Sequence, residues 1–208
     1  MKAFDPKQRH TTSGQITIAL YRIAQAIEYA FRQRSKEVHL SPAQIQALLF
    51  LKNARTHAHT ITGLANRLGV TLATSSDVVD ALEHKRLVER APLPDDQRVV
   101  TLTLTPQGER QAEELENVLD EIEIAVDSLP DAEKTALLHA TQAIVRRLQS
   151  AGYVRVYEMC WGCQFFRRNA HPDNPQAPHH CAFMDAPLPE ADTYRECPDF
   201  VPAEIERG

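Results

Sequence analysis

Four cysteines are confined to the last quarter of this 208-residue sequence: Cys160, Cys163, Cys181 and Cys197. Thiols in this pattern suit a redox-active pair, a disulfide, or the binding of a metal ion or an iron–sulfur cluster. A redox pair would use only Cys160 and Cys163, in "MCWGCQFF", and would leave two thiols unexplained. We therefore expect all four cysteines to bind one inorganic centre.

The spacing favours an iron–sulfur cluster over a zinc ion. Four-cysteine zinc sites usually pair two CxxC motifs, whereas this chain has one such motif. A cluster is larger than a single ion, so it accommodates widely spaced thiolates, and a proline such as Pro198 often follows a cluster ligand. We expect [4Fe–4S] rather than [2Fe–2S], shielded from water by Trp161, Phe165 and Phe166, and we keep structural zinc as the alternative.

Histidines near these cysteines offer further ligands. His179 and His180 directly precede Cys181, but four thiols already complete a site, so we expect both rings in a polar loop. His57 and His59 are expected to face solvent in a loop between helices.

Composition narrows the class of protein. An apolar content of 43% and a charged content of 25% are typical of a globular chain. GxGxxG, GxxxxGK[ST], HExxH and GxSxG are absent, so we expect no enzyme activity. The sequence contains neither a signal peptide nor the roughly 18 to 20 apolar residues of a membrane span, so we expect a cytoplasmic protein that does not enter a membrane.

Charge is distributed unevenly along the chain. Residues 1–104 carry 14 Lys and Arg against 9 Asp and Glu, whereas residues 105–208 carry 9 against 19. Only the first half therefore has the charge to approach nucleic-acid phosphates.

Periodicity predicts a series of helices before the cysteines. Apolar residues recur at steps of three and four from Ile16 to Phe31, and a second helix begins after Ser41 and runs to about Ala54. A short helix capped by Thr60 or Thr62 ends at Gly69, and another follows from Leu72. Two short helices joined by a glycine-containing turn predict a helix-turn-helix.

A predicted β-hairpin follows directly. Strands are expected at Leu87–Arg90 and Val99–Leu104, joined by a turn over Ala91–Arg98 rich in proline and aspartate. One helix capped by Thr105 should continue to Val126, and a last helix should run from Pro130 to Gly152. This order predicts a winged helix.

The segment "LVERAPLPDDQRVVTLTLTPQG", with Asp96-Gln97-Arg98, resembles the wing of the MarR family of bacterial transcription regulators, and the resemblance covers about residues 15–150. It implies a mainly α, winged helix-turn-helix fold with long N- and C-terminal dimerisation helices. It also implies a homodimer that binds a pseudo-palindromic double-stranded operator, as a repressor does.

The resemblance also implies DNA-contacting residues. The recognition helix would be Thr71–Lys85, and its contacts would come from Thr71, Thr74, Ser75 and Ser76. Arg98 would enter the minor groove, oriented by Asp96. Members often have glycine where Arg86 stands, so the recognition helix is expected to end differently in this chain.

We thus divide the chain into a regulator domain, residues 1–151, and an irregular cysteine-rich extension, residues 152–208. Tail motifs such as "CWGCQFF" and "HHCAFMDAPL" are similar to extensions of some MarR-like proteins. Our hypothesis is a dimeric DNA-binding regulator whose cluster senses redox, iron or oxidant state by packing against the dimerisation helices. The rival hypothesis has structural zinc in the tail and a small-molecule effector bound between helices.

Overall fold

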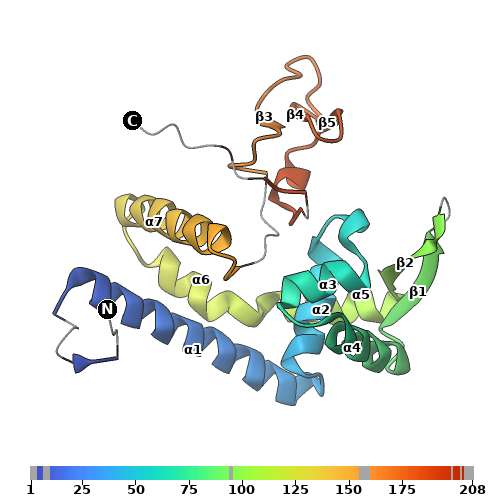
Figure 1. Cartoon of the computed structure of the whole chain (residues 1–208), viewed down its shortest axis with the longest axis horizontal. Helices are drawn as coiled ribbons and strands as arrows, with labels where there is room; N and C mark the ends of the chain where they lie inside the picture. The colour runs from blue at the N-terminus through green and yellow to red at the C-terminus, as the bar shows by residue number, and fades with distance from the viewer. Residues whose placement is uncertain are drawn as a thin grey trace.

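Helices account for most of the chain, and two small antiparallel sheets complete it (Figure 1). The computed structural model describes residues 4–6, 10–93, 96–154, 160–197, 199–201 and 203, with the side chains of residues 93 and 96–99 excepted. The helical elements are α1 (Thr12–Val38), α2 (Pro42–Asn53), η2 (Thr56–Ala58), α3 (Ile61–Leu68), α4 (Leu72–His84), α5 (Pro106–Leu115), η3 (Glu116–Leu119), α6 (Asp120–Asp127), α7 (Asp131–Ser150) and η4 (Ala191–Tyr194). The strands are β1 (Val88–Leu93), β2 (Asp96–Leu104), β3 (Phe166–Arg167), β4 (His179–Cys181) and β5 (Ala186–Leu188).

The hydrophobic core is centred on α2. Its side chains Ile45 and Leu48 are completely buried and belong to one cluster with residues of the neighbouring elements. That cluster includes Leu64 of α3, Leu82 of α4, Leu102 of β2 and Leu115 of α5. Burying a leucine-sized side chain contributes about 1.5–3 kcal/mol, so the position of the helix-turn-helix and wing is set by this apolar contact with α2.

Capping residues begin the helices where the sequence predicts. The Ser41 hydroxyl accepts from the Gln44 amide, and the Gln44 side chain accepts from the Ser41 amide, which forms a capping box. The Thr60 and Thr105 hydroxyls cap α3 and α5 by accepting from the Gly63 and Gly108 amides, and Gly69 ends α3 with a φ of 67°. The predicted helix-turn-helix is confirmed.

The end of the recognition helix differs from our expectation. Arg86 adopts a φ of 58°, the left-handed conformation that favours glycine at the end of a helix. Its amide donates to the Glu83 carbonyl at 2.8 Å, and the Leu87 amide donates to the Leu82 carbonyl at 3.0 Å. These two bonds form a Schellman motif, so the turn is kept without glycine.

Three further elements differ from the predictions. The wing strands are longer than expected, so Asp96 to Arg98 belong to β2 and not to the turn. The single helix expected from Pro106 to Val126 is divided into α5, η3 and α6. The tail, expected to be irregular, contains the sheet β3–β4–β5 with Phe166 paired to Cys181. We call residues 160–201 the cysteine module.

The long terminal helices leave apolar side chains exposed in the single chain. Neither α6 nor α7 contains a buried residue. The exposed apolar side chains on α1, α6 and α7 are Ile16, Tyr21, Ile23, Tyr29, Ile124, Val126, Leu137, Leu138 and Leu148. Within the described part of the chain, no helix combines the length and apolarity that crossing a membrane requires.

We predict that Gly108→Ala destabilises the protein by about 2–3 kcal/mol, because overpacking a rigid contact carries such a cost. A Cβ at Gly108 would lie 1.9 Å from the Leu87 carbonyl oxygen, a backbone atom that cannot turn aside. Urea denaturation followed by circular dichroism measures the change. Gln107→Ala, on the exposed neighbour, is the matched control, and equal midpoints for both variants would contradict the close approach.

Candidate functional site

The N-terminal turn of α4 presents hydroxyl groups to solvent. Thr71 and Thr74 are exposed, their hydroxyl oxygens lie 2.9 Å apart, and the Thr71 hydroxyl caps the helix by accepting from the Thr74 amide. These side chains share an open hollow with Thr62 and Asn66 of α3. Hydroxyl groups beside the positive end of a helix dipole suit a phosphate group.

The two serines that follow are placed differently from the threonines. Ser75 is fully buried, and its hydroxyl donates to the Ile61 carbonyl at 3.1 Å. It therefore packs α4 against α3, which departs from the expected DNA contact. Ser76 is half-buried and accepts from the Arg90 guanidinium at 3.3 Å.

Arg90 is a site residue that our sequence analysis did not identify. It lies on β1, and its guanidinium contacts the carboxylates of Asp80 and Glu83 on α4. The Arg90 guanidinium thus offsets part of the negative charge that Asp80 and Glu83 place on the recognition helix. Because acidic groups repel phosphates, this arrangement lowers the electrostatic cost of bringing α4 to a duplex.

Asp96 and Arg98 lie near the tip of the wing. β2 begins at Asp96, which is paired with Leu93 of β1 across the hairpin. Their side chains lie outside the described part of the structure, so their predicted roles stay predictions.

All four cysteines line one narrow cavity of about 20 Å³. They come from segments up to 37 residues apart, yet each is a free thiol facing the same space. The rest of the wall is apolar or aromatic, apart from Arg55 and Asp199, and consists of Phe165, Phe166, Phe183, Met184, Leu188 and Phe200. Phe165 and Phe166 therefore stand where we expected shielding groups.

The local backbone explains why Cys160 and Cys163 lie together. The Cys163 amide donates to the Cys160 carbonyl at 2.9 Å, which closes a tight turn. Gly162 occupies the third position of this turn with a φ of 95°, a conformation that favours glycine. The sequence Cys-Trp-Gly-Cys thereby places its two thiols on one loop.

The thiols are spread apart. Among the described residues, His57, Cys197 and Asp199 form the set of three candidate ligand atoms that lie within 4.8 Å of one another, and no three of the thiols form such a set. Four thiolates around one zinc ion, at about 2.3 Å each, would place the sulfur atoms about 3.8 Å apart. Four thiolates are the usual donor set of an iron–sulfur cluster, which is larger than a single ion.

Burial raises the pKa of the Cys160 and Cys197 thiols. The Arg55 guanidinium opposes this effect on the pKa of Cys160, since it lies 3.3 Å from the sulfur and donates to it. The Asp199 backbone opposes it at Cys197.

His179 belongs to the scaffold of the module and not to a loop, contrary to our expectation. The ring is buried, and its Nδ1 accepts from the Asn169 amide at 3.1 Å. Nε2 therefore carries the proton and donates to Glu190, which lowers the pKa of that carboxyl. His180 is the next residue of β4, and its Nδ1 lies 3.1 Å from the Nε2 of His171.

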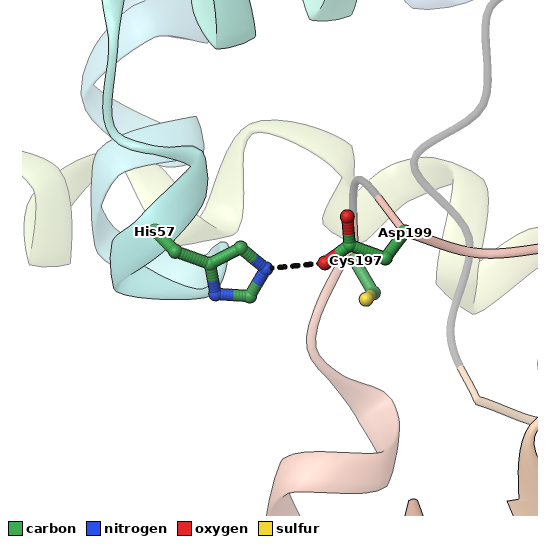
Figure 2. A group of neighbouring side chains, drawn as sticks. All are labelled: His57, Cys197 and Asp199. Carbon is green, nitrogen blue, oxygen red and sulfur yellow. Dashed lines mark hydrogen bonds and ion pairs between the residues drawn. The ribbon is translucent and has the colours of Figure 1, made fainter. Parts of the chain in front are cut away.

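The cysteine module contacts the helix-turn-helix half of the chain, where we had expected the dimerisation helices (Figure 1). The Arg55 amide donates to the Glu196 carbonyl at 3.2 Å, and Arg67 of α3 forms an ion pair with the Glu196 carboxylate at 2.7 Å. Figure 2 shows His57 reaching Asp199, with 2.9 Å between Nε2 and Oδ2 and the Cys197 side chain beside them. His57 is exposed as predicted, whereas His59 is half-buried against the Ala54 carbonyl, which lies 3.2 Å from its Nε2.

A larger cavity of about 680 Å³ lies between α1, α2 and η3. Its apolar wall includes Ile27, Phe31, Leu49 and Leu119. Arg67 and Glu196 also line it, so the contact between α3 and the cysteine module forms part of this wall.

Comparisons with known proteins agree with this architecture. Residues 40–100 match the model of the MarR family. The chain is 31% identical over 102 residues to the uncharacterized HTH-type transcriptional regulator YsmB of Bacillus subtilis, covering 49% of this chain and 68% of that one. It is 24% identical over 156 residues to the HTH-type transcriptional repressor YetL of the same organism, covering 69% of this chain and 93% of that one.

A solved structure has the same fold. The MepR–DNA complex of S. aureus superposes with a TM-score of 0.55 at 22% identity, covering 64% of this chain and 97% of that one. With the helix-turn-helix, the wing and the family match together, the chain belongs to the MarR family of DNA-binding transcriptional regulators.

Proposed function

We propose that the protein is a homodimeric repressor that binds a pseudo-palindromic operator in the cytoplasm and carries an iron–sulfur cluster sensitive to redox, iron or oxidant state. The observation that carries the sensing function is the convergence of all four cysteines on one cavity beside the helix-turn-helix. Named relatives support the regulatory part, because YetL is described as a repressor and MepR was solved with DNA.

The exposed faces of α1, α6 and α7 support a dimer. Residues such as Ile16, Leu138 and Ile124 are between 47% and 61% exposed in the single chain. Covering these faces with a second copy would remove apolar surface from water. A symmetric pair would present two recognition helices, whose separation must match successive half-sites on the duplex.

In this proposal the exposed hydroxyls of Thr71 and Thr74 contact phosphates, and Arg98 enters the minor groove with Asp96 as its orienting partner. Ser76 and Arg90 hold α4 to the wing, so that helix and hairpin approach the duplex as one unit. Ser75 holds α4 against α3 through its hydrogen bond to the Ile61 carbonyl.

We predict that Arg98→Ala lowers the affinity for operator DNA about tenfold and reduces the slope of log K against log salt by about one. Thr74→Val removes a hydroxyl at constant volume and should weaken binding with little change of sequence preference. Fluorescence anisotropy at several salt concentrations measures both, on a duplex selected from a random library by the wild-type protein.

Arg110→Ala is the control for Arg98→Ala, because replacing this exposed arginine on α5 changes the net charge by the same amount. A protein without salt-sensitive affinity for any duplex would overturn the DNA-binding proposal.

The proposed cluster rests on the donor set and its surroundings. Four thiols, mainly apolar walls and a wider spacing than zinc requires all suit a [4Fe–4S] centre better than zinc. The Arg55 guanidinium supplies positive charge beside the cavity, and its Nε is buried without a hydrogen-bond partner in the described structure. Such a group suits a cavity that holds negative charge. When bound, the cluster would supply one-electron redox chemistry, and the chain would supply ligands, positive charge and shielding.

We predict that anaerobically purified protein contains about four iron and four sulfide per chain and absorbs near 400 nm, as expected for a [4Fe–4S] centre. Cys163→Ser should remove most of this iron, whereas His180→Gln, beside the ligand Cys181, should keep it. Metal and sulfide analysis of the same samples decides the outcome. A colourless protein with one zinc per chain would establish the structural-zinc alternative and refute the cluster.

A small-molecule effector is the second candidate function, and the 680 Å³ cavity between α1, α2 and η3 favours it. Cavities of this size with mainly apolar walls take drug-sized ligands. We predict that anilinonaphthalene sulfonate binds there and that Leu49→Trp, which fills the space, weakens its affinity at least fivefold by fluorescence titration. Gln107→Trp adds the same ring on exposed α5, and equal affinities for the two variants would exclude this cavity.

A further inference from the structure

We propose that Arg55 is the positioning residue through which the cysteine module controls DNA binding, and that it acts on the segment joining α2 to α3. This coupling rests on the proposed cluster, and it adds the route by which the state of the cluster changes the affinity for DNA. It replaces the route through the dimerisation helices that the sequence suggested.

Arg55 connects the two halves of the chain by its backbone and its side chain together. The backbone amide donates to the Glu196 carbonyl, beside a parallel bridge between Ala54 and Glu196. The guanidinium donates to the Cys160 sulfur at 3.3 Å and to the Asp192 carbonyl at 3.2 Å. A change at the four thiols therefore acts directly on Arg55, which lies just after the end of α2 in the chain.

The segment after Arg55 reaches the DNA-binding elements within a few residues. The Leu102 amide of β2 donates to the His59 carbonyl at 2.7 Å, so the wing strand is hydrogen-bonded to this segment. A Cβ on Gly63 of α3 would lie 2.0 Å from the Ala58 carbonyl oxygen, which shows how closely α3 packs there. Movement of residues 55–60 therefore shifts both the wing and the helix-turn-helix.

The module leaves the DNA-facing groups open. Its contacts with Arg55, His57 and Arg67 lie on the side of the α2–α3 junction, while Thr71 and Thr74 stay exposed. Regulation by direct obstruction of the recognition helix does not fit this placement. Regulation by holding or releasing the junction does.

Charge explains why Arg55 responds to the centre. Among the described residues that line the four-thiol cavity, Arg55 is the cation. Hydrogen bonds from a guanidinium to a negatively charged acceptor are roughly twice as strong as those between neutral groups. A bound cluster with its thiolate ligands holds Arg55 in place, and loss of the cluster weakens this attachment and frees the junction.

The test compares cluster-loaded and cluster-free full-length protein on the duplex selected by the wild type. The wild-type protein should bind at least tenfold more weakly once the cluster is removed. Compared at equal iron content per chain, the two states of Arg55→Gln should differ less than twofold. Arg168→Gln is the matched control, since this guanidinium lies over the Trp161 ring, 5.1 Å from its centre, inside the module. It should keep the tenfold difference.

A second readout separates positioning from general destabilisation. Hydrogen exchange at the Leu102 amide should quicken on cluster loss in the wild type and not in Arg55→Gln. If Arg55→Gln fails to load iron, Arg55→Lys replaces it, because lysine keeps the positive charge but lacks the planar fork that reaches both the Cys160 sulfur and the Asp192 carbonyl. It should show the same loss of the tenfold difference.

The outcomes distinguish this inference from the proposed function. Wild-type protein without iron would refute the cluster itself. Loaded wild type whose DNA affinity does not change on cluster loss would leave the cluster standing and overturn the coupling. A tenfold difference that persists in Arg55→Gln would overturn the role of Arg55.

Discussion

The burial of α2 is the constraint on which both halves of the molecule depend. Ile45 and Leu48 of this helix are fully covered by the helix-turn-helix, the wing and α5, so the DNA-binding elements have no independent core. The end of the same helix leads directly into Arg55, the attachment point of the cysteine module. A domain this small needs stabilisation beyond its own core. In the proposal, the cysteine module would gain it from a bound metal centre and from docking beside a helix whose position is already fixed.

In the DNA-binding half, charged side chains of the recognition helix pair with a side chain of the wing. The recognition helix carries acidic residues that would repel phosphates, yet Arg90 of the wing offsets part of the charge of Asp80 and Glu83. The same guanidinium contacts Ser76 and so fixes the angle between helix and hairpin. Arg90 thus contributes both to the charge of the recognition helix and to the angle between this helix and the wing. A count of net charge along the sequence reveals neither contribution.

The cysteine module differs from a freely attached tail in having its own polar scaffold. Trp161 donates to Thr193, a completely buried residue, and His179 donates to Glu190. These bonds surround the strand β4 that carries Cys181 and the turn that carries Cys160. Hydrogen bonds of this kind hold the strand and the turn that carry these two cysteines at defined positions.

Local patterns in the sequence determined the elements of this protein. Hydrophobic periodicity, the caps at Ser41 and Thr105, and the glycine turn at Gly69 are decided by neighbouring residues, so they predicted the winged helix-turn-helix correctly. The cysteine spacing predicted a shared centre, which stays a prediction, and the structure brings the four thiols to one cavity. Tertiary structure decided the rest: that Ser75 is buried and that the module docks on Arg55. These outcomes depend on contacts between segments up to 142 residues apart, whose energies no local pattern contains.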